Sequence, residues 1–334
     1  MSEPTPDLFF ETVKAYQSTA ALKTAIELRI FDAIANGHTT PKQLAQACDA
    51  AKRGIRILCD YLTIKGFLIK SGNTYQLTLD TQTYLNSQSP QYLGSAVTYL
   101  LSAPMQTAFQ NLTTAVQKGS TALSQNGFLA PDHPAWTAYA KSMAPVMRVP
   151  AKQLAQHLDP TADQPLAILD IAAGHGLFGL AFAQQNPHTT VTALDWPTVL
   201  TVAQTHAQDY GLSNQFKTLS GNAFDTPFGN PHNITILANI LHHFAPNACI
   251  ALLKKVHQNL HPNGRVAILE FIPNADRVSP PEEAAFALVM LATTLNGDVY
   301  TYDELNNMCL QAGFSHTHLH ALGQGEQQVV IGFK

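Results

Sequence analysis

The stretch that decides the fold is "LAILDIAAGHGLFGLAFA", Leu166 to Ala183. Its first six residues are apolar except for Asp170, which predicts a strand buried on both faces of a parallel sheet. Gly174 to Gly179 then spell the pattern G-x-G-x-x-G, and the residues that follow predict a helix. A glycine loop between a strand and a helix predicts a nucleotide-type binding crevice.

Two carboxylates near the loop bear on which ligand it holds. Asp195 ends the next expected strand, "TVTALD", 21 residues after Gly174, where an acid accepts hydrogen bonds from ribose hydroxyls. Asp170 lies four residues before Gly174 and would repel the pyrophosphate of a nicotinamide dinucleotide. It suits S-adenosylmethionine, whose ammonium and sulfonium groups are cationic, and we favour that ligand.

Further strands alternate with helices after the glycine loop. They are expected at Phe216, Asn233 and Arg265, and in "SHTHLHAL" and "QQVVIGF" near the end. This alternation predicts a doubly wound, Rossmann-like α/β sheet. The short connection from Gly323 to Gly325 predicts that the last two strands pair antiparallel.

The N-terminal part predicts helices and one hairpin. "AALKTAIELRIFDAI" spaces its apolar residues as one helix, Thr40 and Gln43 form a capping box, and "FLIKSGNTYQLT" predicts a hairpin. This is a winged helix. Residues 1–100 hold nine Lys/Arg and eight Asp/Glu, a weak footprint for DNA, so we favour a dimerisation or lid module. Residues 100–160 predict helices with a break near Gly127.

Composition sets the class of protein. The 334 residues are 46% hydrophobic and 13% charged, with a formal charge of −4, which predicts a globular chain without a nucleic-acid partner. The longest apolar run, Ala284 to Ala292, is half a membrane span, and the N-terminus lacks the order of a signal peptide. Four scattered cysteines favour reduced thiols in the cytoplasm.

Five motifs in order resemble those of class I S-adenosylmethionine-dependent small-molecule O-methyltransferases. They are D-x-A-x-G-x-G at Asp170, "ALDWP" at Ala193, "GNAF" at Gly221, "NILHHF" at Asn239 and "EFIPN" at Glu270. The resemblance covers about residues 10 to 334. It implies a winged-helix dimerisation domain (1–100), a helical linker with acceptor-pocket helices (101–160), a methyltransferase domain (161–334), and a homodimer.

The resemblance also implies a cofactor site and a catalytic pair. The cofactor residues would be Asp170, Ala172, Gly174, Gly176, Asp195, Trp196, Asn222, Ala223, Ala238 and Arg148. His242 corresponds to the catalytic histidine, and Glu270 ends the strand expected beside it. A positioned histidine can take the proton of a phenol during methyl transfer, and Glu270 can fix its tautomer. His243 is the alternative base, although it should point elsewhere.

The sequence departs from the family pattern at four positions. Ala172 replaces a glycine, which should only tighten the loop, and Asn222 replaces an aspartate that binds adenine. His243 replaces an aspartate, and Val299 stands where relatives carry a second acid. The last change leaves C- or N-methylation open as alternatives, and an S-adenosylmethionine-responsive DNA-binding regulator remains the alternative of another class.

The acceptor is expected to be a small, hydroxylated aromatic metabolite. Met143 and Met147 share one helix face, as do Phe286 and Met290, and both pairs suit an aromatic ring, although core packing explains them equally well. His175 should contact the cofactor only through its backbone. His316, His318 and His320 alternate on one expected strand, and we expect no metal there.

Overall fold

The computed structural model describes residues 4–124, 132–159, 163–322 and 327–334. The positions of Gly127 and of the Gly323–Gly325 connection lie outside these residues. The chain divides into two compact units, Met1–Val97 and Thr98–Lys334. None of the described helices is both long enough and apolar enough to cross a membrane.

The first unit consists of helices and one hairpin. Thr40 caps its helix with the expected capping box, and the two strands pair antiparallel around Gly72 and Asn73. The expected helix over "AALKTAIELRIFDAI" is in fact broken at Arg29, whose backbone is left-handed. The elements are α1 (Asp7–Glu27), α2 (Ile30–Ala35), α3 (Pro41–Ala47), α4 (Lys52–Ile64), β1 (Leu68–Ser71), β2 (Thr74–Leu77), α5 (Leu79–Tyr84) and η1 (Gly94–Ala96).

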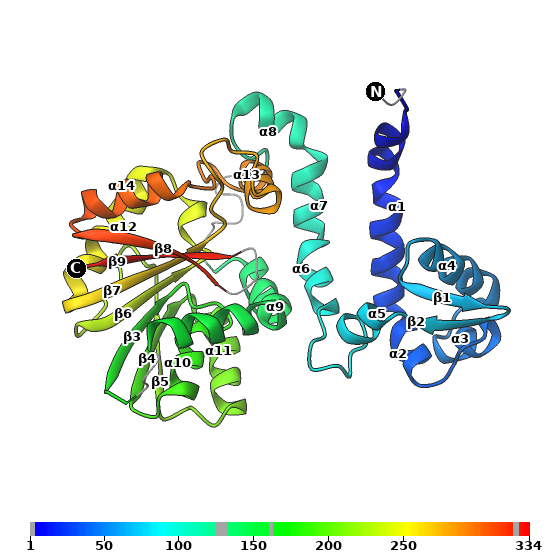
Figure 1. Ribbon diagram of the computed structural model, residues 1–334, viewed down its shortest axis with the longest axis horizontal. Helices are drawn as coiled ribbons and strands as arrows, with labels where there is room; N and C mark the ends of the chain where they lie inside the picture. The colour runs from blue at the N-terminus through cyan, green and yellow to red at the C-terminus, as the bar shows by residue number, and fades with distance from the viewer. Residues whose placement is uncertain (1–3, 125–131, 160–162, 323–326) are drawn as a thin grey trace. The chain divides into compact units, whose positions relative to one another are not determined.

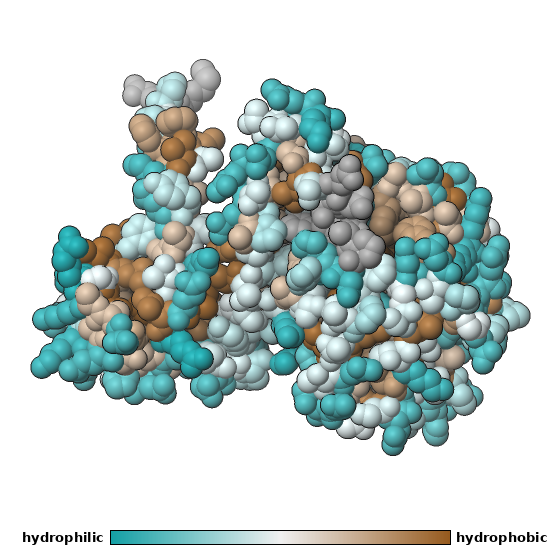
Figure 2. Space-filling model, turned by 180° about the vertical axis from the view of Figure 1, so that it is seen from behind, coloured by the Kyte–Doolittle hydropathy of each residue, from teal (hydrophilic) through white to brown (hydrophobic). Residues whose placement is uncertain are grey.

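The N-terminal half of α1 carries large apolar side chains on its surface. Leu8, Phe9, Phe10, Val13 and Tyr16 are all exposed, between 49% and 77% of each residue's area. Figure 2 shows hydrophobic surface, in brown, along this helix. Only Ala25 is buried among the residues of α1, so most of this helix is not used by the core of its own unit.

The second unit holds a seven-stranded sheet in the order β5-β4-β3-β6-β7-β9-β8 (Figure 1). All neighbouring pairs from β5 to β7 are parallel; β9 runs antiparallel to both β7 and β8, as expected for the last two strands. The strands are β3 (Leu166–Ile171), β4 (Thr189–Asp195), β5 (Phe216–Ser220), β6 (His232–Ala238), β7 (Leu260–Glu270), β8 (His316–Ala321) and β9 (Gln328–Phe333).

Helices cover both faces of this sheet, which confirms the doubly wound fold. On one face of the sheet, Ile168 is buried beneath α9, α10 and α11, which pack together. On the other face, Leu169 is buried beneath α12 and α14. The helices are α6 (Val97–Leu100), α7 (Ala103–Gln110), α8 (Leu112–Lys118), α9 (Pro134–Leu158), α10 (Leu177–Gln185), α11 (Pro197–Asp209), η3 (Leu241–His243), α12 (Pro246–Asn259), α13 (Pro281–Thr293) and α14 (Tyr302–Ala312).

Two glycines of the G-x-G-x-x-G stretch are explained by packing. A Cβ on Gly176 would lie 2.8 Å from the Cβ of Ala203 on α11, and a Cβ on Gly179 would lie 2.5 Å from Val191 on β4. Gly176 also has a φ of +73° at the N-cap of α10. These glycines therefore let α10 approach its neighbours closely, and β3 and β4 deliver their carboxyl ends to one edge of the sheet.

Candidate active site

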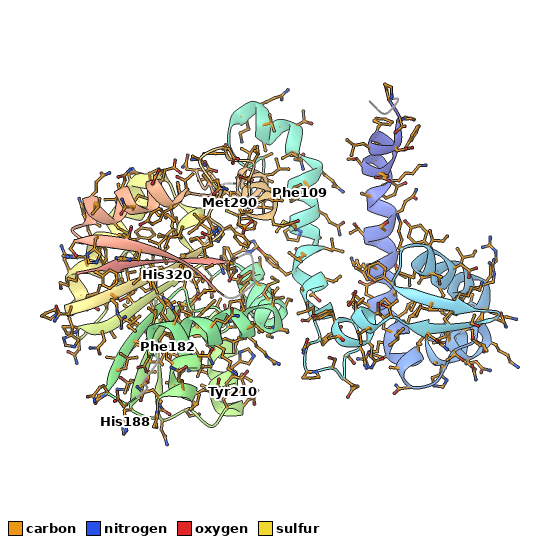
Figure 3. All side chains as sticks on the ribbon, in the orientation of Figure 1. Phe109, Phe182, His188, Tyr210, Met290 and His320 are labelled. Carbon is orange, nitrogen blue, oxygen red and sulfur yellow. The ribbon has the colours of Figure 1, made fainter. Side chains whose placement is uncertain are left out.

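A cavity of about 440 Å³ lies at the carboxyl ends of β3, β4 and β6, within the second unit. Loops after the strands line it with Ala172, Gly174, Asp195, Asn222 and Ala238. Helices α7, α9 and α13 line it with apolar side chains; Figure 3 shows Phe109 on α7 and Met290 on α13 among them. The cavity therefore combines a polar sheet edge with an apolar helical wall.

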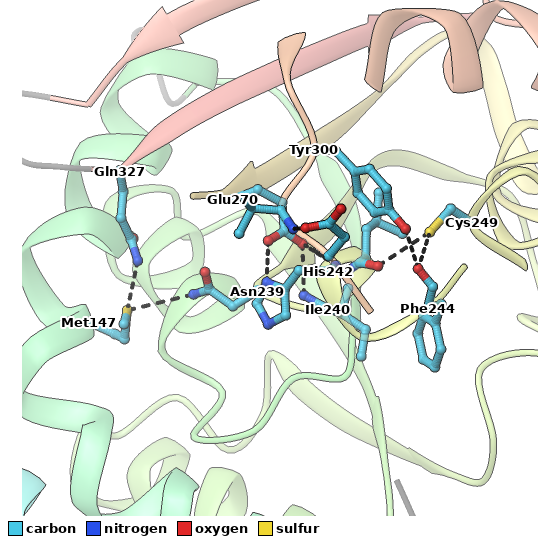
Figure 4. Close-up of polar contacts among 12 residues, drawn as sticks. Met147, Asn239, Ile240, His242, Phe244, Cys249, Glu270, Tyr300 and Gln327 are labelled. Carbon is cyan, nitrogen blue, oxygen red and sulfur yellow. Dashed lines mark hydrogen bonds and ion pairs between the residues drawn. The ribbon is translucent and has the colours of Figure 1, made fainter. Parts of the chain in front are cut away.

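His242 and Glu270 form a buried pair at this cavity (Figure 4). They come from the ends of β6 and β7, which are hydrogen-bonded neighbours as expected. Nδ1 of His242 hydrogen-bonds to Oε2 of Glu270, while Oε1 accepts from the backbone N–H of Ile240 at 3.0 Å and Leu241 at 2.8 Å. The acidic partner favours the tautomer with its proton on Nδ1, which leaves Nε2 of His242 as a proton acceptor.

The local chain explains how His242 reaches the cavity. Asn239 has a φ of +54°, a left-handed conformation that asparagine tolerates, and its N–H bonds to the carbonyl of Leu269 at 2.8 Å. This turn ends β6 and starts η3. Gly297 packs against the other side of η3, since a Cβ there would lie 2.3 Å from the carbonyl oxygen of His242.

Asp195 places a buried carboxylate at the polar edge of the cavity. Its Oδ2 accepts from the N–H of Gly174 at 2.8 Å and its Oδ1 from the N–H of Trp196 at 2.7 Å. Burial raises the pKa of Asp195 to about 6, and the two backbone hydrogen bonds oppose that rise. Apart from its neighbours in the chain, a Cβ on Gly174 would have only the carbonyl oxygen of Ala172 within 4 Å among the described residues, so a ligand can approach the backbone there.

Trp196, Ala223 and Ala238 also line the cavity, as do Ala172 and Asn222. Ala172 has a φ of +54°, so the residue that replaces the family glycine holds a left-handed conformation at about 1–2 kcal/mol. The expectation that it merely tightens the loop missed this strain. Oδ1 of Asn222 accepts from the N–H of Phe224 at 2.9 Å and so shapes its own loop.

Three expected cofactor residues do not reach the cavity. The carboxylate of Asp170 does not line the cavity; it accepts a hydrogen bond from the N–H of Gly179 on α10 at 3.0 Å. Burial raises the pKa of Asp170 to about 7. Gly176 packs against α11 instead, and Arg148 is exposed one residue after the cavity-lining Met147 on α9. We therefore leave these three residues out of the set proposed to contact the cofactor.

The structure also places His175, whose backbone contact with the cofactor stays a prediction, and His243, which differs from its expected direction. His175 accepts from the N–H of Leu177 through Nδ1, and its carbonyl is bonded to His206, so it is a structural residue; burial lowers its pKa to about 3. His243 does not point elsewhere, because its ring lines the cavity 4.4 Å from the ring of His242. Burial and the neighbouring His242 hold the pKa of His243 well below its usual value.

The expected acceptor residues Met143, Met147, Phe286 and Met290 all line the cavity. Phe286 stacks on Phe271 at 4.3 Å and meets the His242 ring edge-on at 5.1 Å. Sequence reasoning missed an aromatic set that shares this wall: Tyr99, Phe109, Trp136, Tyr139, Phe244 and Phe271. Trp136, Tyr139, Met143 and Met147 continue one helical stripe of α9, a spacing that could have revealed the first two.

Val299 is buried and is not among the residues that line the cavity. Across residues 4–124, 132–159, 163–322 and 327–334, no three His, Cys, Asp or Glu side chains cluster as a metal ion requires. His316, His318 and His320 are residues of β8, and the rings of His318 and His320 stack on each other.

The fold and this cavity define a methyltransferase of the class I type. Residues 109–315 match the O-methyltransferase domain family and residues 10–87 match the O-methyltransferase dimerisation domain. The chain belongs to this O-methyltransferase family.

Similar proteins span nearly the whole chain. The tetracenomycin polyketide synthesis 8-O-methyl transferase TcmO of Streptomyces glaucescens is 27% identical, covering 98% of this chain and 97% of its own. A proposed O-methyltransferase from Nostoc punctiforme, solved by crystallography, is 46% identical with full coverage of both chains and a TM-score of 0.95. Human N-acetylserotonin methyltransferase in complex with S-adenosylmethionine shares the fold at 21% identity, with a TM-score of 0.87 and 100% and 99% coverage.

Proposed function

We propose that this protein transfers a methyl group from S-adenosylmethionine to a hydroxyl of a small, uncharged aromatic acceptor, with His242 as general base. The observation that carries the proposal is the buried His242–Glu270 pair at the wall of the cavity. A phenol has a pKa near 10, so an imidazole Nε2 that accepts its proton as the oxygen attacks lowers the barrier. Glu270 holds that imidazole in place and supports its positive charge.

The residues of the polar edge fit the cofactor. Each oxygen of Asp195 accepts one backbone hydrogen bond and keeps a lone pair for a ribose hydroxyl. Ala172 and Gly174 would offer backbone for close approach of the cofactor. Asn222, Ala223, Trp196 and Ala238 line the same cavity and would hold its nucleoside. The bound cofactor supplies a methyl group already activated by its sulfonium, so the protein needs to align the acceptor and remove its proton.

The wall of the cavity selects an uncharged acceptor. Its polar lining is small. Among the described residues that line it, Asp195 is the only aspartate or glutamate. No lysine or arginine is in this set, so an acceptor carboxylate would lose its hydration without gaining a counter-ion. The aromatic rings and the methionines instead suit a flat, neutral ring system.

The first unit supports a homodimer. It contains the dimerisation-domain match, and the exposed apolar residues of α1 supply surface for pairing with a second copy. We propose that residues 1–100 dimerise, that residues 101–160 shape the acceptor side and that residues 161–334 bind the cofactor. The reduced thiols agree with a cytoplasmic setting, since all four cysteines are free.

A matched pair of acceptors tests this function. We would compare 2-naphthol with 6-hydroxy-2-naphthoate, which differ by one carboxylate, using labelled S-adenosylmethionine and mass analysis of the product. We expect methyl ether formation with kcat/KM at least about tenfold higher for the neutral phenol. A preference for the carboxylate would refute the uncharged-acceptor proposal, and a product methylated at carbon would refute O-methylation.

A further inference from the structure

The loop after β5, residues 221–226, forms part of the cavity wall through Gly221, Asn222, Ala223 and Phe224. It is tightly folded: a Cβ on Gly221 would lie 2.1 Å from Oγ1 of Thr226, and the N–H of Thr226 bonds to the carbonyl of Asn222 at 2.9 Å. Its shape therefore decides where Asn222 and Ala223 lie, although neither residue is held there by a strand or a helix.

Lys255 on α12 fixes this loop from outside the cavity. Its ammonium donates to the carbonyl of Ala223 at 2.9 Å, of Phe224 at 3.0 Å and of Thr226 at 2.7 Å. The same Nζ lies 4.2 Å from the centre of the Phe228 ring. An ammonium has three donors, so all of them are committed to one loop.

These contacts are stronger than ordinary loop hydrogen bonds. Each has a charged donor, and such bonds are worth roughly twice their neutral counterparts. Lys255 is only half-buried, and burial lowers its pKa while the charge of Asp225 opposes that change. Without the ammonium, three carbonyl oxygens would lose their common partner, and the loop would be free to adopt other conformations. A ligand would then bear the entropy of ordering it.

We propose that Lys255 is a positioning residue for the cofactor, holding the 221–226 loop in the conformation that receives the nucleoside. It does not line the cavity and acts only through the loop. The inference rests on the proposed function for the identity of the ligand. It predicts that a side chain outside the cavity controls cofactor affinity while leaving the chemistry at His242 untouched.

Three variants test this role with S-adenosylhomocysteine as the probe. Lys255→Met keeps the apolar stem and removes the donors, Lys255→Arg restores charged donors, and Lys254→Met changes the adjacent, exposed lysine of the same helix. Calorimetry should show an affinity about tenfold lower for Lys255→Met, largely recovered in Lys255→Arg and unchanged in Lys254→Met. At saturating S-adenosylmethionine, kcat with 2-naphthol should equal that of the parent, so the effect falls on the KM for S-adenosylmethionine.

Several results would overturn the proposal. An affinity of Lys255→Met within twofold of the parent, even with a lowered melting temperature, would show that Lys255 only stabilises the fold. If Lys255→Met does not fold, Lys255→Gln, which keeps one amide donor, takes its place under the same criterion. Failure of the parent itself to bind S-adenosylhomocysteine would overturn the cofactor assignment together with this role. Normal binding by the parent and by Lys255→Met, or by Lys255→Gln where it takes the place of Lys255→Met, would overturn the role of Lys255 alone.

Discussion

The affinity for S-adenosylhomocysteine should depend on pH through Asp195. Burial raises the pKa of Asp195 to about 6, and the ionised carboxylate is the form that accepts strongly from the ribose hydroxyls. The favourable interaction is therefore present above pH 6 and is lost as the pH falls through that value. At pH 5 only about one molecule in ten has the carboxylate ionised, so each pH unit below 6 should weaken binding by up to about tenfold.

Calorimetric titration between pH 5 and pH 8 measures this dependence directly. Asp195→Asn should bind about tenfold to a hundredfold more weakly at pH 8 and should lose most of the dependence on pH. Its amide would also turn an N–H toward the N–H of Gly174 or Trp196, so its melting temperature is measured alongside. Asp209→Asn, an exposed acid on the following helix, is the control and should bind as the parent does. Equal affinity of the parent at pH 5 and pH 8 would refute this reasoning.

Four further outcomes are expected. Asp170→Asn should stabilise the protein at pH 8. The raised pKa of the Asp170 carboxyl costs stability as pH rises, so the gain declines as pH falls from about 7 toward 4. Melting curves measured at several pH values check this, and an unchanged melting temperature at pH 8 would contradict it. Light scattering should give about twice the chain mass of 36.2 kDa, and Phe9→Asp should shift the protein toward monomer; a monomeric parent would be contrary to the proposal. His243→Gln should slow methyl transfer far less than the same change at His242, and an equal loss would make His243 a candidate base. Glu270→Gln should slow turnover at least tenfold while S-adenosylhomocysteine affinity persists, because an amide N–H facing Nδ1 favours the wrong tautomer; full activity would exclude Glu270 as the orienting group.

Much of the fold could be predicted because the spacing of apolar residues and the residues at caps and turns act locally. The apolar run before Asp170, the capping box at Thr40 and the turn at Gly72 each specify an element within a few residues, and all three are present. The break at Arg29 was missed because the apolar spacing continues through it. The chain there turns so that Ile30 and Phe31 enter the core of the first unit, which is a tertiary effect.

The site could be predicted only where strand order fixes it. His242 and Glu270 follow neighbouring strands, so their meeting was foreseeable from the order of the motifs. The direction of an individual side chain was not. Asp170 points to α10, and His243 turns into the cavity because it lies in the short helix η3, where neighbouring residues do not alternate as they do in a strand. The hydrogen bonds from Lys255 to the 221–226 loop join residues 29 to 32 positions apart, so no local sequence pattern reveals them.

The central claim is that His242 removes the acceptor proton, and the single-turnover rate of His242→Gln tests it most directly. The glutamine keeps a polar side chain but cannot act as a base at neutral pH. With saturating S-adenosylmethionine and 2-naphthol, methyl transfer should fall by about 10²–10⁴-fold, while the affinity for S-adenosylhomocysteine stays within about twofold of the parent. A His242→Gln variant that transfers methyl at the parental rate would contradict the account.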